Sequence, residues 1–375
     1  MSKAFDFAKC IEGSGSYDGQ MIPAGSGGTG VTGEMRYNTT TGQIEFWSPT
    51  STTPAWRPVK DGPLIVVNTH FLVIAGGGGG GGGTMGGGGG AGGYRTSWGS
   101  GNISGGNSAV ESALQLLKDT AYTVTVGTGG AGGQNASNST SVSNMGVRGT
   151  DSVFATVTSF GGGPGVGYYG NQPNTPHSPL PTTNTGFGSG GGHGAFEPST
   201  GAFLAAMQGT AGQGMRGGVQ VLSTHSADYN GQGGGGAGEA GDDRVNIGDQ
   251  PAGGDGLSSN ITGTAITRAG GGGGGAHGGT NNGGAGGSGG GGRGGDGNGL
   301  YITAGAANTG SGGGGAGSSA GAAGGSGLVV IRIPNTHTAT FSSGVTQTMS
   351  TVGTDRVYTV TATSSTSETV TFTED

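Results

Sequence analysis

The stretch "FLVIAGGGGGGGGTMGGGGGAGGYRTS", residues 71–97, decides the fold of this chain. The short apolar segment "FLVIA", which is typical of a buried strand, continues directly into eight consecutive glycines at 76–83. A second glycine block follows at 86–90. Glycine loses more backbone freedom on folding than any other residue. The question is whether these glycines form a linker, a disordered segment or a folded part of the protein.

Composition favours a folded part. The chain has 375 residues and 99 glycines, about a quarter of the total, where about 7% is usual. Disordered segments combine low hydrophobicity with high charge, but only 9% of these residues are charged and the net charge is −7. An apolar strand followed by a glycine block also recurs, at 71–83, 122–133 and 153–163. Disorder remains the alternative.

The glycine blocks can fold if they take the polyproline II conformation, which turns once in three residues. Without side chains, such helices can lie side by side and bond their backbone groups to one another. Asn282, Ala285 and Ser288 are spaced three apart with glycine between them, as are Arg293 and Asp296. Collagen requires glycine at every third position without lapse, and here the phase breaks repeatedly. We therefore expect a mainly β protein with a packed bundle of polyglycine/polyproline II helices, in which Thr84-Met85 is a turn between neighbours.

Three regions follow along the chain. Residues 1–62 predict a small N-terminal module with a hairpin around Thr41-Gly42, whose apolar side chains are Met35, Tyr37, Ile44, Phe46 and Trp56. Residues 63–327 predict the glycine-rich domain with short strands and inserted loops. Residues 328–375 are rich in Thr and Val and predict β strands that close this domain or form a small sandwich.

Three strand predictions are specific. "PLIVVNTHFLVIA" predicts two strands around Asn68-Thr69. "ALQLLKDTAYTVTV" predicts a hairpin that turns at residues 118–120, with a short helix over 110–118 as the alternative. In its second half, Tyr122 and Val124 alternate with threonines at the strand period. "SVFATVTSFGGG" predicts a single strand entering glycine.

These elements in this order suggest a family. A strand followed by "AGGGGGG", then "YTVTVGTGGAGG", "GGGGAGG" blocks and a closing "GSGLVVIRIP" resembles the glycine-rich domain of bacteriophage tail-fibre and virion proteins. It is similar, more loosely, to the glycine-rich region in the ectodomain of anaplastic lymphoma kinase. Tail-fibre tip adhesins of T-even-like phages also contain packed polyglycine helices. The N-terminal "GEMRYNTTTGQIEFW" resembles a hairpin of phage structural proteins, whereas "YYGNQPNTPHSPLPTTNTGFG" departs from the pattern.

The resemblance implies a non-enzymatic virion protein, most simply a tail-fibre or fibre-tip component that binds the host cell surface. Its partners would be other tail or fibre proteins, through the N-terminal module, and a host glycan or outer-membrane protein. A homotrimer is expected only by analogy with fibres. A purely structural head fibre or decoration protein is the alternative, and a polysaccharide depolymerase is a third reading. No signal peptide is recognised, in agreement with assembly in the host cytoplasm.

Loops on a rigid scaffold commonly carry binding residues, and aromatic rings supply contact area at low entropic cost. The candidate receptor contacts are therefore aromatic or histidine residues between the glycine blocks: Tyr94, Trp98, Tyr168, Tyr169, His177, Phe187, His225 and Tyr229. The competing interpretation is that these rings simply cover exposed glycine helices.

Other chemistry finds little support. "GSGGTG" at 25–30 fits a dinucleotide fingerprint but lacks the strand and helix around it, and no P-loop is present. "GGRGGDGNG", with Asp296, resembles a single calcium-binding nonapeptide, which needs stacked copies. The six histidines lack zinc-ligand spacing. "GGSGG" around Ser288 matches a nucleophile elbow by composition alone.

Paired carboxylates in "GDDRVNIGDQPAGGDG" could hydrolyse a sugar, but a solvated loop is the simpler interpretation. We expect no catalytic activity, cofactor or metal. The composition, which is not basic, also argues against nucleic acid. Cys10 is the single cysteine, so no internal disulfide can form.

Overall fold

The computed structural model describes most of the chain from residue 66 onward and, before it, the backbone of four strands. The described ranges are 66–99, 101, 103–135, 144–167, 186–194, 206–220, 230–246, 248–278 and 282–375. Two compact units are present, residues 1–65 and 66–375. The described residues are mainly β, as predicted, with one short 3-10 helix, η1 (Gly105–Asn107). No described helix is long and apolar enough to cross a membrane.

The N-terminal unit contains a four-stranded sheet in the order β1-β2-β3-β4. Its strands are β1 (Ala24–Gly25), β2 (Met35–Asn38), β3 (Gln43–Ser48) and β4 (Ala55–Pro58). The predicted hairpin is confirmed, since β2 and β3 pair antiparallel with Met35 opposite Phe46 and Tyr37 opposite Ile44. The predicted turn at Thr41-Gly42 lies outside the described residues.

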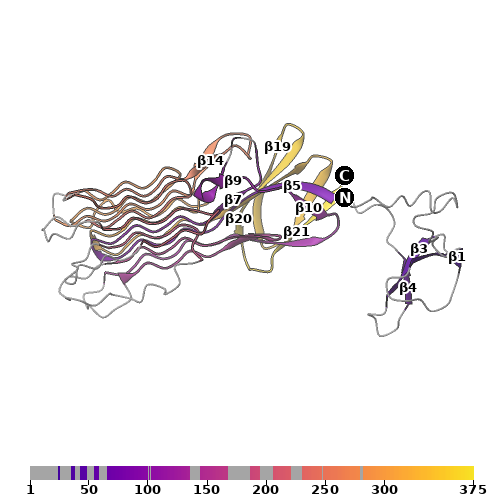
Figure 1. Ribbon diagram of the computed structural model, residues 1–375, viewed down its shortest axis with the longest axis horizontal. Helices are drawn as coiled ribbons and strands as arrows, with labels where there is room; N and C mark the ends of the chain where they lie inside the picture. Colours follow the sequence, from indigo (N-terminus) through magenta and orange to yellow (C-terminus); the bar gives the residue numbers. More distant parts are fainter. Residues whose placement is uncertain are drawn as a thin grey trace. The chain divides into compact units, whose positions relative to one another are not determined.

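In the second unit, strands lie at one end and glycine-rich segments run side by side away from them (Figure 1). The longer strands are β5 (Val66–Ile74), β10 (Leu114–Leu117), β11 (Ala121–Thr125), β17 (Leu328–Pro334), β18 (His337–Phe341), β19 (Val345–Val352), β20 (Asp355–Thr363) and β21 (Thr369–Glu374). The shorter ones are β6 (Gly83–Thr84), β7 (Tyr94–Thr96), β8 (Ile103–Ser104), β9 (Ser108–Ala109), β12 (Ser152–Phe154), β13 (Val157–Ser159), β14 (Leu257–Ser259), β15 (Ile266–Arg268) and β16 (Ser318–Ser319).

Two sheets carry the apolar core. One has the order β10-β5-β17-β20-β19, with β7 also paired to β5, and the other has the order β13-β12-β11-β21-β18. A cluster with buried side chains from both sheets, including Phe71, Ile331, Phe154 and Phe372, joins them. A second cluster, with Leu72, Ile74 and Val330, covers the other face of β5 and β17. Burial on both faces explains why "FLVI" and "LVVI" are continuous apolar runs.

Three of the strand predictions need correction. Residues 66–74 form one strand, β5, rather than two strands around Asn68-Thr69, because β10 pairs across that point and Thr69 lies opposite Leu114. The turn at residues 118–120 is present, but it joins two sheets instead of closing a hairpin. Its strand β10 pairs with β5, whereas β11 pairs with β12 and β21. "SVFATVTS" is a hairpin of β12 and β13, since Ala155 has a positive φ of 50°.

The glycine block at 76–82 is bonded to other segments through its backbone. Its N–H groups donate to three different segments in rotation, so that every third glycine reaches the same neighbour. The acceptors are Thr150, Val147 and Asn144 for glycines 76, 79 and 82, Gly325 and Ala322 for glycines 77 and 80, and Gly90 and Gly87 for glycines 78 and 81. The second glycine block therefore lies beside the first, as predicted, and Met85 turns between them with a φ of 58°.

The carbonyl groups of the same block accept bonds from three further segments. Gly130 and Gly133 donate to carbonyls 77 and 80, Gly162 and Gly165 to 76 and 79, and Gly313 and Ala316 to 78 and 81. One glycine segment thus has six neighbours, three as acceptors and three as donors. We call this arrangement of hydrogen-bonded glycine segments the glycine lattice.

The glycine lattice has no space for side chains inside it. A Cβ atom added at Gly77 would lie 2.0 Å from the carbonyl oxygen of Ser311, and one at Gly284 would lie 1.9 Å from that of Pro251. Some of the larger residues point outward, whereas others, such as Arg244 and Gln232, are buried. Asn282, Ala285 and Ser288 are all exposed, as their three-residue spacing predicts, while Gly284 and Gly287 between them are buried.

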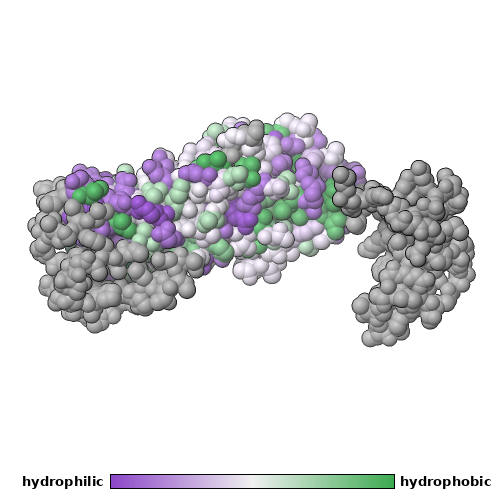
Figure 2. All heavy atoms as spheres, viewed as in Figure 1, coloured by the Kyte–Doolittle hydropathy of each residue, from purple (hydrophilic) through white to green (hydrophobic). Residues whose placement is uncertain are grey.

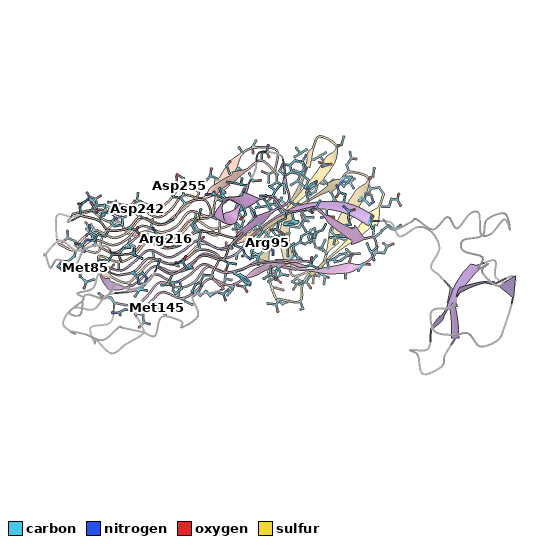
Figure 3. All side chains as sticks on the ribbon, viewed as in Figure 1. Met85, Arg95, Met145, Arg216, Asp242 and Asp255 are labelled. Atoms are coloured by element: carbon cyan, nitrogen blue, oxygen red, sulfur yellow. The ribbon has the colours of Figure 1, made fainter. Side chains whose placement is uncertain are left out.

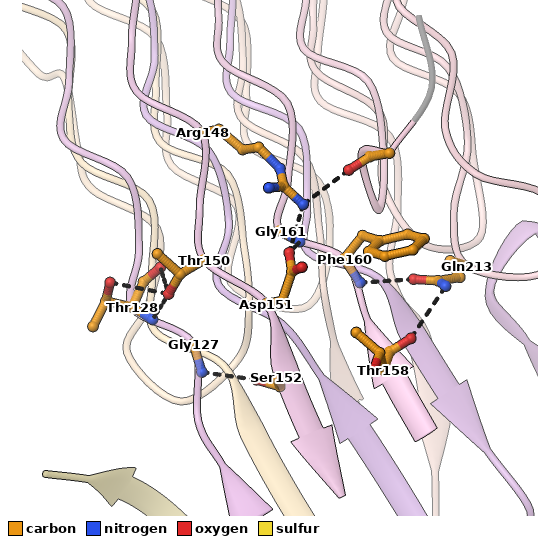
Figure 4. Close-up of polar contacts among 11 residues, drawn as sticks. Gly127, Thr128, Arg148, Thr150, Asp151, Ser152, Thr158, Phe160, Gly161 and Gln213 are labelled. Atoms are coloured by element: carbon orange, nitrogen blue, oxygen red, sulfur yellow. Dashed lines mark hydrogen bonds and ion pairs between the residues drawn. The ribbon is translucent and has the colours of Figure 1, made fainter. Parts of the chain in front are cut away.

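Side chains bridge the junction where strands become glycine segments (Figure 4). The Ser152 hydroxyl donates to the Ile74 carbonyl at 2.8 Å and accepts from the Gly127 N–H at 2.8 Å. The Gln213 amide oxygen accepts from the Phe160 N–H at 2.8 Å. Asp151 accepts from the Gly161 N–H at 2.8 Å and pairs with Arg148. These contacts satisfy backbone groups at the point where the hydrogen-bonding pattern changes from pairs of strands to the lattice.

A carboxylate also holds the loops beside the end of β11, where the chain enters the lattice; the Val124 N–H donates to the Glu368 carbonyl. Glu368 accepts hydrogen bonds from the hydroxyl groups of Ser342, Ser364 and Ser365. These bonds favour the ionised form and lower the pKa of Glu368. The contact ties the loop before β21 to the end of β18.

Replacing buried lattice glycines should destabilise the protein. We expect Gly284→Ala to lower the free energy of unfolding by at least about 1–3 kcal/mol, because its new methyl group meets a backbone carbonyl that cannot move alone. The neighbouring exposed change Ala285→Ser is the matched control and should cost less than about 0.5 kcal/mol. Denaturant unfolding measures both values, and equal losses would contradict the packing described above.

Stability should fall in acid through Glu368. Because its folded-state pKa is lowered, its contribution is fully present above the unfolded pKa of about 4.3 and is lost as pH falls through the folded value. Glu368→Gln should therefore melt at a lower temperature than wild type at pH 7, and the gap should close towards pH 3. Thermal melts across this range test the sign; a gap that widens on acidification would refute it.

Candidate recognition surface

The eight aromatic and histidine candidates divide into two groups. Tyr94, Trp98 and Phe187 lie in the described part of the chain. The remaining five lie outside the described residues: Tyr168, Tyr169, His177, His225 and Tyr229. The structure therefore bears on the first three only.

Tyr94 and Phe187 are packed inside the unit. Tyr94, on β7, is fully buried in the second apolar cluster. Burial raises the pKa of its hydroxyl to about 12, against smaller opposing effects of Ser259 and the charge of Arg268. Phe187 packs with Val166 and Met207 between glycine segments. Neither ring is available to a partner in this structure.

Trp98 is half-buried and engaged by several residues. The guanidinium carbon of Arg332 lies 3.7 Å from the Trp98 ring centroid, and the His70 ring meets it edge-on at 5.0 Å. The indole N–H donates to the side chain of Asn260 at 3.0 Å. Arg332 is held by Asp355 at 2.8 Å and by the Ile261 carbonyl at 3.0 Å. These contacts join β5, β17 and the turn between β14 and β15. Trp98 therefore has a structural role beside the strands.

In "GDDRVNIGDQPAGGDG", Asp242 and Asp255 are exposed, as the solvated interpretation predicts, and the carboxylates also bond to backbone groups. Asp242 accepts from the N–H of Ala252 at 3.2 Å, and Asp255 accepts from the N–H of Ser288 at 2.7 Å. Asp249 accepts from the N–H groups of Val245 and Asn246. Each carboxylate thus fixes one backbone segment, and Figure 3 labels Asp242 and Asp255 along the glycine-rich segments.

Asp243 binds Arg216 in a bidentate pair with distances of 2.7 and 2.9 Å, and accepts from the Val219 N–H. Burial alone would raise the pKa of Asp243, but these hydrogen bonds and the charge of Arg216 outweigh it and lower the pKa. The pair fastens the segment at 214–220 to the segment at 241–246. It is a brace between neighbouring segments.

Side chains crowd around the strands and are sparse along the lattice, whose end far from the strands carries the Met85 label (Figure 3). We call the turns at 83–85, 297–301 and 318–320 the free end. They are in contact, because β6 pairs with β16 and the Ser318 hydroxyl donates to the Gly297 carbonyl at 3.1 Å.

The turn at 297–301 is tightly held by Asp296. The Asp296 carboxylate accepts from the N–H groups of Asn298 and Leu300 at 3.1 and 2.7 Å. The Asp296 N–H donates to the Leu300 carbonyl at 2.9 Å. The sequence motif around Asp296 resembles a calcium-binding nonapeptide. In the structure, the hydrogen bonds given above connect Asp296 to residues of this turn. Among the described residues, no group of three or more His, Cys, Asp or Glu could hold a metal ion.

This turn presents Leu300 and Tyr301 to solvent. Their exposed fractions are 56% and 64%, and they are the only two adjacent members of the exposed large apolar residues in the described chain. Figure 2 shows hydrophilic and apolar residues interspersed over the face that it draws. Tyr301 also has a φ of 61°, a left-handed conformation that is unfavourable for a bulky residue. Such strain is typical of functional sites.

Basic and polar side chains flank this pair. The guanidinium carbon of Arg293 lies 5.3 Å from the Tyr301 ring centroid, and its Nη2 donates to the Asn282 side chain at 3.3 Å. An aromatic ring, an aliphatic side chain and a cation together can bind apolar faces and donate hydrogen bonds to a partner's oxygen atoms. We call Leu300, Tyr301, Arg293 and Asn282 the free-end patch.

The sequence contains a signal for the free-end patch. "DGNGLY" combines turn residues with two large apolar side chains, and Arg293 is three residues from Asp296. The comparison with a calcium-binding nonapeptide does not identify this patch, because it concerns the carboxylate and not the two apolar side chains. The Arg332–Trp98 contact gave no such signal, because its residues are far apart in the chain.

Comparison with known proteins identifies a family for most of the chain. Residues 61–334 match the family model of a glycine-rich domain. No curated protein and no solved structure matches the chain. Since the matched region covers most of the sequence and contains the segments described above, this chain belongs to the glycine-rich domain family.

Proposed function

We propose that the glycine lattice is a bundle of polyglycine helices of the polyproline II type. Three residues per turn would direct every third N–H to the same neighbour, which is the rotation found for glycines 76–82. At a rise of about 3.1 Å per residue, eight glycines would span about 25 Å. The exposure of every third residue at 282, 285 and 288 supports the same geometry.

On this scaffold we propose a non-enzymatic bacteriophage virion protein, a tail-fibre or fibre-tip component that binds the host cell surface. The observation that carries the proposal is the dense backbone packing of the glycine segments, which leaves little room for side chains between them. Such a body would be rigid, and it would present side chains at the free end. A rigid body that presents loops is a common arrangement for binding.

We assign one proposed partner to the N-terminal unit and the other to the free end. The N-terminal unit would attach the protein to other tail or fibre proteins, and the free end would meet a glycan or an outer-membrane protein of the host. The free-end patch, with Tyr301 and Arg293, is the described surface best suited to this contact. We propose the virion as its location, reached after synthesis in the host cytoplasm.

Substitution of Tyr301 tests the proposed contact. We expect Tyr301→Gly to abolish binding of the purified protein to a panel of bacterial cells, because the ring is lost. The same change should leave the free energy of unfolding equal or raise it by up to about 1 kcal/mol, because glycine removes the cost of the left-handed conformation. Flow cytometry with labelled protein and a denaturant titration measure the two effects.

Ile266→Ala is the matched control, since Ile266 is an exposed apolar residue on β15, away from the free end. Its binding should equal that of wild type. Binding that survives at Tyr301→Gly and at substitutions of Tyr168 and Tyr169 would instead favour a purely structural virion protein, such as a head fibre. Shortening of host polysaccharide by the purified protein would indicate a depolymerase.

Truncation tests the role of the N-terminal unit. We expect a chain lacking residues 1–62 to fold with an unchanged melting transition of its glycine-rich unit, because the two units are separately compact. It should no longer join virions, as measured by immunoblotting of purified particles. Incorporation at the level of the full chain would show that attachment lies elsewhere.

A further inference from the structure

The strand β19 forms one edge of the larger sheet and pairs with β20 on one side only. Its six central residues are all exposed, and Met349 has an exposed fraction of 53%. In an antiparallel sheet, alternate residues of an edge strand direct their N–H and C=O groups away from the sheet. Such an edge is a ready template for another strand. Figure 1 places β19 at the margin of the strand region.

The edge carries none of the features that commonly block pairing. Natural edges are protected by charged residues, by proline, by bulges or by short length. The sequence of β19, "VTQTMSTV", has eight residues without charge or proline. The pairing of β19 with β20 shifts between Thr346 and Gln347. The unpaired extra residue is Thr361 of β20, so β19 itself has no bulge.

Apart from β7, which has three residues and pairs with β5, three other strands form edges of these two sheets, and they differ from β19. β10 has four residues and is followed by Lys118, which lies 3.8 Å from both Asp119 and Glu374. β13 has three residues and runs directly into the lattice. On β18, the Arg356 guanidinium donates to the His337 carbonyl at 2.7 Å and pairs with Asp375. Only β19 offers a long uncharged edge among these four.

We propose that β19 pairs antiparallel with β19 of a second copy of this chain, to form a two-fold dimer with one continuous sheet. Residues opposite each other in an antiparallel pair are either both hydrogen-bonded to one another or both not. Neighbouring residues of one strand alternate between these two kinds of position, so a residue cannot face its own neighbour in the second copy. In a two-fold dimer, one residue must therefore lie directly opposite the same residue of the other chain. Thr348 is at the middle of the strand and takes this position.

This register makes the edge complementary to itself. Thr348 faces Thr348, Thr346 faces Ser350, and Gln347 faces Met349. Hydroxyl pairs of this kind are favourable across strands, and no like charges meet. The contact also covers the exposed Met349. Fibres suggest a three-fold assembly, but this edge supports a two-fold one.

Sedimentation equilibrium of the full chain tests the proposal. Wild type should have the mass of two chains at about 100 µM and dissociate on dilution. Thr348→Lys places two like charges opposite each other and should raise the dissociation constant at least about tenfold, with an unchanged melting temperature. Thr340→Lys, at an exposed position on the β18 edge, is the matched control and should dimerise as wild type does.

Cross-linking tests the register. In a Cys10→Ser background, Thr348→Cys should form an intermolecular disulfide under mild oxidation, because directly opposite Cβ atoms are about 4.5–5.5 Å apart. Met349→Cys should cross-link at least about fivefold more slowly, since its copy is diagonal to it. A monomeric or trimeric wild type, dissociation by Thr340→Lys as strong as by Thr348→Lys, or faster cross-linking at 349 would overturn the proposal. These outcomes are independent of binding at the free end.

Discussion

The approach of one glycine backbone to another is the constraint on which this structure depends. A Cβ added at almost any lattice position would lie within about 2–3 Å of a neighbouring carbonyl. The absence of side chains allows each segment to exchange hydrogen bonds with several neighbours. Those bonds offset the large entropic cost of ordering glycine only when they form together. The lattice must therefore be cooperative, since a single ordered glycine segment would have nothing to bond to.

The two sheets fix the positions at which the glycine segments begin. Segments leave from β5, β11 and β13 and return into β7, β12 and β17, so strand pairing fixes where each segment begins. Leu328 lies opposite Ile74, and the segment ending at Gly327 thereby meets the segment starting at Ala75. Apolar burial, which glycine cannot supply, is concentrated in the two clusters around β5 and β17. The hydrophobic effect orders the strands, and the strands set the register of the glycine segments.

Local sequence predicted the elements better than their partners. The strands at β5, β11 and β17, the turn near Met85 and the outward spacing of Asn282, Ala285 and Ser288 follow from periodicity and composition. The pairing did not follow, because "LQLLKDTAYTVTV" has the same local pattern whether its strands join one sheet or two. Within the predicted strand region at 328–375, the position of β19 at an edge does not follow from the sequence for a related reason. Its residues are exposed on both faces, so no alternation of apolar and polar side chains marks it.

Candidate recognition residues are harder to predict than the fold. Aromatic rings between glycine blocks suggest display, yet the rings of Tyr94 and Phe187 are buried among other side chains. Tyr301, like Tyr94 and Phe187, stands beside glycine-rich sequence. Unlike them, it lies at a turn and has a positive φ, which the sequence alone does not reveal. Whether a side chain of the lattice is exposed depends on how far it lies from the strands and on its position within the three-residue repeat. A large side chain is accommodated most easily at the margin of the lattice or where a segment turns, and the turns at the free end are therefore where the sequence can vary without disturbing the backbone contacts behind them.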